Sequence, residues 1–327
     1  MVKNSLVLLD GPPLSGVTRS MDETVRRRLP NARLAPFTAL GLAEFSARSD
    51  VGAQFSSVEQ TVLRLDDLSP ADLVLLGHGV LDDVLPHALV MATMATAWCE
   101  RLLKDGSAVT APARAVLVQY AKRVSVAFAM TPREEAALRE MGFPVSKGFA
   151  ESIVGGESLV RRYRRRARSH REGHLLVQAA VDARRCGIHR PLGTEEMYRL
   201  WCVFGDYEHD RCCLAFPRAL DWARALPRDA GTGLLVHAAG GTSPHWRVLS
   251  YAAGADDGDH GHEPRPLGDH ERNAVLTSLP DAADQFAIGI AAHLHDRRDT
   301  AKAALTQAAE AAAQGHPAGA AAAAALY

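Results

Sequence analysis

Gly11-Pro12-Pro13-Leu14-Ser15-Gly16-Val17-Thr18 is the stretch that decides the fold of the first part of the chain. It directly follows the apolar run 6–9, which has the character of a strand buried on both faces. It leads into residues 17–29, which are polar and rich in helix formers. Glycine and proline between two such segments predict a strand, a tight loop and a helix.

This loop also fits the phosphate-binding pattern G-x-x-x-x-G-K-[ST] at every defining position except the lysine, which is replaced by Val17. In an intact loop, backbone N–H groups surround the phosphates, the lysine reaches the outer phosphates, and Ser or Thr holds magnesium. Arg19 leaves the helix in another direction and is a poor substitute for the lysine. The alternative is a plain strand-turn-helix corner that never meets a phosphate. The candidate phosphate contacts are Gly11, Ser15, Gly16, Val17, Thr18 and Arg19.

The rest of the first part alternates short apolar runs with longer helix-forming segments. This alternation predicts a parallel sheet covered by helices, and therefore an α/β fold. After the first strand, we expect strands at residues 32–36, 71–76 and 124–130, and helices at residues 57–65, 81–104 and from Pro132 onward.

The predicted strand 71–76 is followed by Gly77-His78-Gly79, where an ATPase with such a loop needs a carboxylate to position magnesium and water. Histidine does not replace an acid for a hard cation, which prefers oxygen. The nearest carboxylates, Asp82 and Asp83, also suit an ordinary helix N-terminus. The missing lysine and the missing acid together predict weak or absent hydrolysis and leave magnesium without a secure ligand.

The predicted strand 124–130 leads into Thr131-Pro132-Arg133. A guanidinium at this place could sense the charge of a terminal phosphate, which makes Arg133 a further candidate nucleotide contact. The alternative is a helix N-terminus that begins with proline and carries a solvated arginine.

The second half of the chain changes character twice. From about residue 155 the pattern is helical without strands, and residues 233–237 and 246–251 then predict a hairpin around Gly-Gly-Thr-Ser-Pro. The last helices are expected at 271–279, 281–294 and 300–314. We therefore divide the chain into a core at residues 1–152, a helical region at 153–228, and a mixed module of hairpin and helices at 229–327.

This order of features resembles the STAND-type signalling NTPases, P-loop relatives of the AAA+ and NACHT proteins, in versions of actinobacterial type. The resemblance spans most of the chain and rests on the loop 11–18, on Thr131-Pro132-Arg133 and on residues 156–187. Residues 156–187 look like the winged-helix-like segment that follows the NTPase core in such proteins. Residues 287–313 look like the start of tetratricopeptide-like repeats, with barely one repeat hairpin.

The family implies a switch that binds ATP or ADP, changes its oligomeric state and passes a signal to a protein effector, often in bacterial defence or regulation. The departures at the lysine and at the acid resemble degenerate, non-hydrolysing members, so no catalytic residue and no metal ligand are assigned. The alternative is an ATP-dependent small-molecule phosphotransferase of nucleoside-kinase or antibiotic type. Such kinases use the lysine, and a compact kinase has no place for the long C-terminal half.

Two further clusters are candidates for binding. Residues 161–168 carry six arginines around Tyr163, a patch that suits phosphates of a nucleotide or nucleic acid, although a solvated helix face is the commoner reading. His260, His262 and His270 with nearby aspartates suggest a metal site, but their glycine-rich setting favours disorder, and metal ligands need rigid support.

Composition excludes several functional classes. The 37 basic and 38 acidic residues nearly cancel, which argues against general binding to nucleic acid or to an anionic membrane. No secretory leader or run of eighteen apolar residues occurs, so we expect a cytoplasmic protein without a membrane span. The cysteines lack paired C-x-x-C spacing, which indicates reduced thiols and not zinc; they are Cys99, Cys186, Cys202, Cys212 and Cys213.

Overall fold

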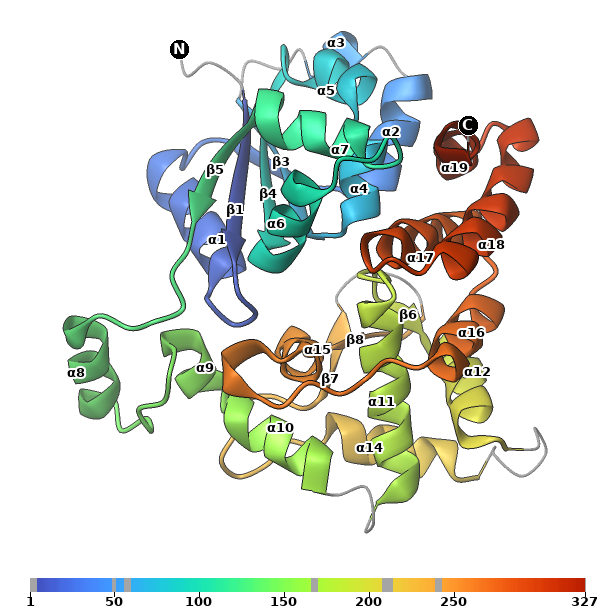
Figure 1. The fold of residues 1–327 in the computed structure, drawn as a ribbon. Helices are drawn as coiled ribbons and strands as arrows, with labels where there is room; N and C mark the ends of the chain where they lie inside the picture. The colour runs from blue at the N-terminus through green and yellow to red at the C-terminus, as the bar shows by residue number, and fades with distance from the viewer. Residues whose placement is uncertain are drawn as a thin grey trace. The chain divides into compact units, whose positions relative to one another are not determined.

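The computed structural model describes residues 5–48, 51–55, 60–165, 170–207, 214–238 and 243–326. The chain forms two compact units (Figure 1). Met1–Pro12, Gly16–Val126 and Asp281–Tyr327 make up the first, here called the sheet unit, and Pro13–Ser15 and Ala127–Pro280 make up the second, the helical unit. This grouping differs from the three consecutive segments predicted, because the last helices group with the N-terminal sheet and the hairpin groups with the helical region.

The sheet unit is built on a five-stranded parallel sheet in the order β2-β3-β4-β1-β5. It confirms the predicted α/β class. The central strand β4 is buried along almost its whole length, as a sheet covered on both faces requires, whereas the edge strand β5 is largely exposed. The strands are β1 (Leu6–Gly11), β2 (Arg33–Pro36), β3 (Thr61–Leu68), β4 (Ala88–Ala95) and β5 (Ala121–Ser125).

Helices cover both faces of this sheet because the side chains of each strand alternate between them. On one face, Leu9 and Val62 pack against Met21 of α1 (Val17–Arg28). On the other face, Leu6 and Leu8 belong to a larger core closed by several helices. These helices are α2 (Ala39–Arg48), α4 (Pro70–Leu75), α5 (His78–Val84), α6 (Thr96–Lys104) and α7 (Ala111–Ala115).

Several predicted elements of this unit are wrong. Residues 61–68 form β3, which overlaps the expected helix 57–65. Residues 71–76 lie largely in α4 where a strand was expected, and residues 88–95 form β4 inside the expected helix 81–104. A capping box explains the second error. The Ser69 hydroxyl accepts from the Asp72 N–H, the Asp72 carboxylate accepts from the Ser69 N–H, and Pro70 occupies the first turn.

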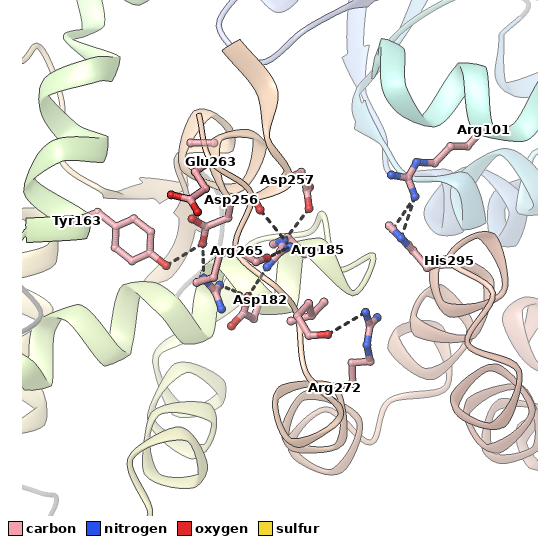
Figure 2. Close-up of polar contacts among 12 residues, drawn as sticks. Arg101, Tyr163, Asp182, Arg185, Asp256, Asp257, Glu263, Arg265, Arg272 and His295 are labelled. Carbon is pink, nitrogen blue, oxygen red and sulfur yellow. Dashed lines mark hydrogen bonds and ion pairs between the residues drawn. The ribbon is translucent and has the colours of Figure 1, made fainter. Parts of the chain in front are cut away.

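The C-terminal segment adds three helices to the sheet unit, α17 (Ala282–Leu294), α18 (Arg298–Ala309) and α19 (Pro317–Leu326). Phe286, Ile290 and Leu305 form their shared core together with Ala71 of α4. The Arg101 Nη1 atom of α6 lies 2.8 Å from Nδ1 of His295, at the end of α17 (Figure 2). The segment is therefore packed onto the sheet unit, as a tail too short for a free-standing solenoid requires.

The close approach of α17 and α18 depends on Gly289. A Cβ atom at this position would lie 2.7 Å from Leu305 Cγ and 2.8 Å from Leu305 Cδ2. We expect Gly289→Ala to lower the free energy of unfolding by about 1–3 kcal/mol through overpacking, measured by urea denaturation. Gly79→Ala is the matched control, because Gly79 is also helical and a Cβ there meets nothing within 4 Å. Equal stability of the two variants would contradict this account of the helix contact.

The helical unit consists of short helices around a small antiparallel sheet in the order β6-β8-β7. The pairing of β7 with β8 confirms the predicted hairpin, while the turn residues 239–242 lie outside the described residues. β6 adds a short strand to the region predicted as purely helical. The elements are α8 (Pro132–Glu140), α9 (Phe149–Val154), α10 (Gly156–Arg165), α11 (Arg171–Arg185), β6 (Leu192–Gly193), α12 (Thr194–Gly205), α14 (Phe216–Arg224), β7 (Leu235–Ala238), β8 (His245–Val248), α15 (Ser250–Asp257) and α16 (Asp269–Ser278).

A buried ionic network, made of Tyr163, Asp182, Arg185, Asp256 and Arg265, joins α10, α11 and α15 to the segment before α16 (Figure 2). Asp182 accepts from Arg265 and lies 3.3 Å from Arg185 Nη1. Asp256 accepts from Tyr163 Oη at 2.9 Å and from Arg265 Nε at 2.8 Å. Burial is the main cause that raises the pKa of the Tyr163 hydroxyl, which therefore stays protonated and donates.

Candidate functional site

The phosphate-loop candidate has the predicted local form. β1 ends at Gly11 and α1 begins at Val17, and Gly16 has a φ of 87°, a left-handed conformation that favours glycine. The tip, Pro13–Ser15, groups with the helical unit, where Leu14 packs against a cluster that contains Val160 and Tyr251. The loop therefore has the glycine geometry of a phosphate cradle, together with a tip that packs through an apolar side chain.

Asp66 is a carboxylate near the end of β3, where no strand was expected from the sequence. Thr18 Oγ1 on α1 donates to Asp66 Oδ1 over 2.8 Å, and Thr93 Oγ1 on β4 donates to the same oxygen over 2.7 Å. Thr18 is the residue that the motif assigns to magnesium, and its hydroxyl is hydrogen-bonded to an acid near the end of a strand. The prediction that the acid is lost is therefore wrong, because it took residues 71–76 for the third strand.

The carboxylates considered in place of that acid have other partners. Asp82 and Asp83 lie on α5, where Asp82 accepts from Tyr120 Oη and Asp83 accepts from Ser46 Oγ, each over 2.7 Å. Sequence signals for Asp66 were present in Leu65-Asp66-Asp67, an acidic pair after apolar residues, but the helical reading of residues 57–65 concealed them. Asp82 and Asp83 therefore offer no support for a magnesium site.

A bend in β3 places the Asp66 carboxylate. Asp67 has a φ of 63°, and the register with β4 shifts between Leu65 and Leu68. The Asp67 N–H donates to Thr93 Oγ1 over 2.7 Å, so Thr93 accepts from Asp67 while it donates to Asp66. The hydroxyl of Thr93 thus fixes both acidic residues at the end of the strand.

Arg64 adds a positive charge to the same group. It lies two residues before Asp66 on β3, and therefore on the same face of the sheet. Its Nε lies 3.0 Å from Asp22 Oδ1 on α1, and its Nη2 lies 3.4 Å from Asp66 Oδ2. The sequence does not indicate these contacts of Arg64, because the proximity of Arg64 to Asp22 depends on how β3 packs beside α1.

A second polar cluster lies at the base of the loop, around Asp10 at the end of β1. The Asp10 side chain is fully buried, accepts from the hydroxyls of Thr96 and Ser125 over 3.1 Å each, and lies 3.2 Å from Arg123 Nη2. Burial and then the Asp10 charge raise the pKa of the Cys99 thiol to about 12. Cys99 is therefore a protonated structural thiol and not a nucleophile.

The other residues predicted to contact phosphate differ in whether their side chains could reach it. Val17 packs at the edge of the apolar cluster on the α1 face, and Arg19 is exposed on α1. Ser15 Oγ is buried without a hydrogen-bond partner among the described residues. Gly11, Gly16 and Thr18 keep the positions that the motif assigns to them. Val17 therefore leaves the loop without the motif's cation, and Arg19 stays a poor substitute.

Arg133 does not lie on the sheet. β5 ends at Ser125, so the predicted strand 124–130 is wrong and the chain has left the sheet before Arg133, which is exposed on α8 of the helical unit. Thr131 caps this helix, since its hydroxyl accepts from the Glu134 N–H and its own N–H donates to Glu134. The geometry matches the alternative of an ordinary capped helix with a solvated arginine.

Described members of the arginine-rich helix point partly inward. Arg162 donates to the carbonyls of Trp222 and Ala225, and Arg164 donates to those of Ala255 and Glu263. Arg161 and Arg165 are exposed, while Arg166 and Arg168 lie outside the described residues. Arg162 and Arg164 of this patch therefore bind backbone carbonyls within the helical unit.

The histidine-rich segment is packed and not disordered, contrary to the prediction. The His260 ring stacks on Tyr251 at 4.9 Å between centroids and lies 4.1 Å from the Phe128 ring. Burial lowers the pKa of His260 and of His262, which keeps both rings neutral near pH 7. Across the described ranges, no group of three or more His, Cys, Asp or Glu side chains is arranged to hold a metal ion.

A cluster not noticed in the sequence joins Asp105, Ser107 and His293. Ser107 Oγ lies 2.8 Å from His293 Nε2, which suggests a nucleophile, but it donates its proton to Asp105 over 2.6 Å. Although burial opposes it, hydrogen bonds from Ser107 and Thr110 hold the pKa of Asp105 below its usual value. Asp105 thus binds the serine and does not orient the far side of the imidazole, so the cluster is no catalytic triad.

None of the described helices combines the length with the apolar character needed to cross a bilayer. Cys99, Cys186 and Cys202 are buried, while Cys212 and Cys213 lie outside the described residues.

Comparison with known proteins gives a distant likeness to a solved structure. No protein family model and no curated protein matches the chain. A STAND (signal transduction ATPase with numerous domains) protein with a tetratricopeptide repeat sensor from Pyrococcus horikoshii is similar at 12% identity and a TM-score of 0.33. The similarity covers 93% of this chain and 56% of that one, so this chain spans little more than half the length of that structure. At such a TM-score the likeness does not establish a shared fold.

Proposed function

We propose that the chain is a STAND-like signalling or regulatory scaffold whose sheet unit binds ATP or ADP at the loop 11–18 and does not hydrolyse it efficiently. The observation that carries this proposal is the hydrogen bond from Thr18 Oγ1 to Asp66. It joins the hydroxyl of a phosphate-loop motif to an acid near the end of β3, which is separated from β1 by β4 in the sheet. A plain strand-turn-helix corner has no need of that pairing.

The proposal of weak hydrolysis rests only on the replacement of the motif's lysine by Val17, since Asp66 offers an acid near the end of β3. Val17 supplies no charge where the motif's lysine would stabilise the transferring phosphoryl group, and Arg19 is exposed. The loss of one such electrostatic group typically slows an enzyme by about 100- to 1000-fold. Binding tolerates this loss better, because backbone N–H groups and the N-terminus of α1 remain.

The proposed partners are a protein effector and further copies of the chain. This part of the proposal rests on the resemblance of the sequence motifs to signalling NTPases, and the winged-helix-like and tetratricopeptide-like segments remain predictions with it. Nucleic acid is disfavoured by the balanced charge, and Arg162 and Arg164 already bind backbone carbonyls within the helical unit.

Val17→Lys tests the loop directly. Calorimetric titration with ATP should show binding to the parent protein and roughly 10- to 100-fold tighter binding to the variant, since a charge-assisted hydrogen bond contributes about 1.5–3 kcal/mol. Thr24→Lys is the matched control, because it adds the same charge at an exposed position of the same helix. It should leave the ATP affinity within about twofold of the parent, since exposed charges at such a distance are screened.

Two results would count against the proposal. Unchanged affinity in Val17→Lys would mean that the loop does not cradle phosphate. Rapid phosphate transfer by the parent protein to water or to a small acceptor would favour the phosphotransferase, a reading that the Thr18–Asp66 pair also accommodates.

A further inference from the structure

We infer that Arg64 occupies the electrostatic role of the magnesium ion at this site, so that the loop takes nucleotide in its metal-free form. This inference rests on the proposed function and concerns the regulation of the same site. It starts from the charges grouped around Thr18, which are Asp22, Arg64 and Asp66. Arg64 is the cation between the two carboxylates.

The contacts of the Asp66 carboxylate leave it poorly suited to a metal. Its Oδ1 atom accepts from the hydroxyls of Thr18 and Thr93 at 2.8 and 2.7 Å, and its Oδ2 atom lies 3.4 Å from Arg64 Nη2. Both oxygens therefore already face donors. A magnesium ion that approached Oδ2 would stand beside the Arg64 guanidinium and be repelled by it, and magnesium gives up its own water reluctantly.

Arg64 is held in this position. Its Nε lies 3.0 Å from Asp22 Oδ1, and although the pair is not aligned as a hydrogen bond, it fixes the guanidinium between α1 and β3. The Arg64 side chain is only 25% exposed, so its charge is screened less than that of a surface arginine. Because a guanidinium is always protonated, its repulsion of a divalent cation does not vary with pH.

The position of Arg64 also relates to the missing lysine. A site with lysine and magnesium presents separate cations to the phosphates, whereas here Val17 has replaced the first and Arg64 neutralises the acid that would serve the second. The ligand class that suits this arrangement is a free nucleoside di- or triphosphate without a bound divalent ion. Magnesium should therefore weaken ATP binding or leave it unchanged, by withdrawing free ATP into its magnesium complex.

The test titrates the full chain with Mn²⁺ alone and measures the Mn²⁺ affinity by electron paramagnetic resonance. The parent protein should bind Mn²⁺ weakly, and Arg64→Gln should bind it at least about tenfold more tightly, because Asp22 and Asp66 lose their internal counter-ion. Arg64→Met serves as a second variant if the first fails to fold. Arg33→Gln is the matched control, since it removes an exposed arginine from the edge strand β2. It should behave as the parent does.

A double variant locates the gained site. Adding Asp66→Asn to Arg64→Gln should return the Mn²⁺ affinity toward the parent value. Equal affinities of parent and folded Arg64 variants would overturn the role given to Arg64, as would a gain that persists without the Asp66 charge.

Nucleotide titrations of the same proteins, with EDTA or with magnesium, separate the two proposals. The parent should bind ATP at least as well in EDTA, while Arg64→Gln should gain a requirement for magnesium. Tighter binding of ATP to the parent with magnesium than in EDTA would overturn the metal-free assignment. If no variant binds nucleotide, the proposed function and the metal-free ligand fail together, and the Mn²⁺ titration still decides whether Arg64 excludes a divalent ion.

Discussion

Asp182→Ala should lower the free energy of unfolding by about 3–5 kcal/mol, the loss typical when one partner of a buried ion pair is removed. The Asp182 side chain has no exposed surface, and it accepts from Arg265 and Arg185. Arg185 is only 8% exposed, so its guanidinium would remain buried with one anionic partner fewer. Chemical denaturation monitored by far-ultraviolet circular dichroism measures the loss.

Asp257→Ala is the matched control for this experiment. Asp257 also pairs with Arg185, at 2.8 Å, but its side chain is 42% exposed. Water replaces much of such a contact, so the control should lose no more than about 1 kcal/mol. If both variants lose the same free energy, burial of Asp182 is not the source of the effect.

Asp10→Ala should lower the free energy of unfolding by about 2–4 kcal/mol. It removes the acceptor of two hydroxyl groups, on Thr96 and Ser125, and leaves the Arg123 guanidinium beside a new cavity under the loop. The expected loss is smaller than at Asp182, because the Arg123 side chain is 29% exposed and can regain water. Thermal and urea unfolding should agree on this order.

Arg123→Gln separates charge from hydrogen bonding at the same site. It keeps both hydroxyl donors on Asp10 and removes the partly exposed cation, so its loss should be clearly smaller than that of Asp10→Ala. A larger loss in Arg123→Gln would mean that the ion pair, and not the two hydroxyls, holds the base of the loop.

Part of the candidate site could be predicted from the sequence. The run 6–9, the glycines at 11 and 16 and the polar helix that follows are local signals, and the structure has a strand, a left-handed Gly16 and a helix there. Arg133 could not be placed in the same way. Thr131 and Glu134 cap α8 as their spacing indicates, but the end of β5 at Ser125 depends on its pairing with β1.

The sequence by itself determined the α/β class and the loop between β1 and α1, because backbone preferences and burial patterns over a few residues suffice for both. Only the tertiary structure decided that residues 61–68 are a strand, since parallel pairing with β2 and β4 prevails over their mixed polar pattern. That pairing brings Asp66 to Thr18 and Arg64 to Asp22, contacts between residues more than 40 positions apart. The charge balance of the site therefore arises from packing between distant segments, which no local sequence pattern encodes.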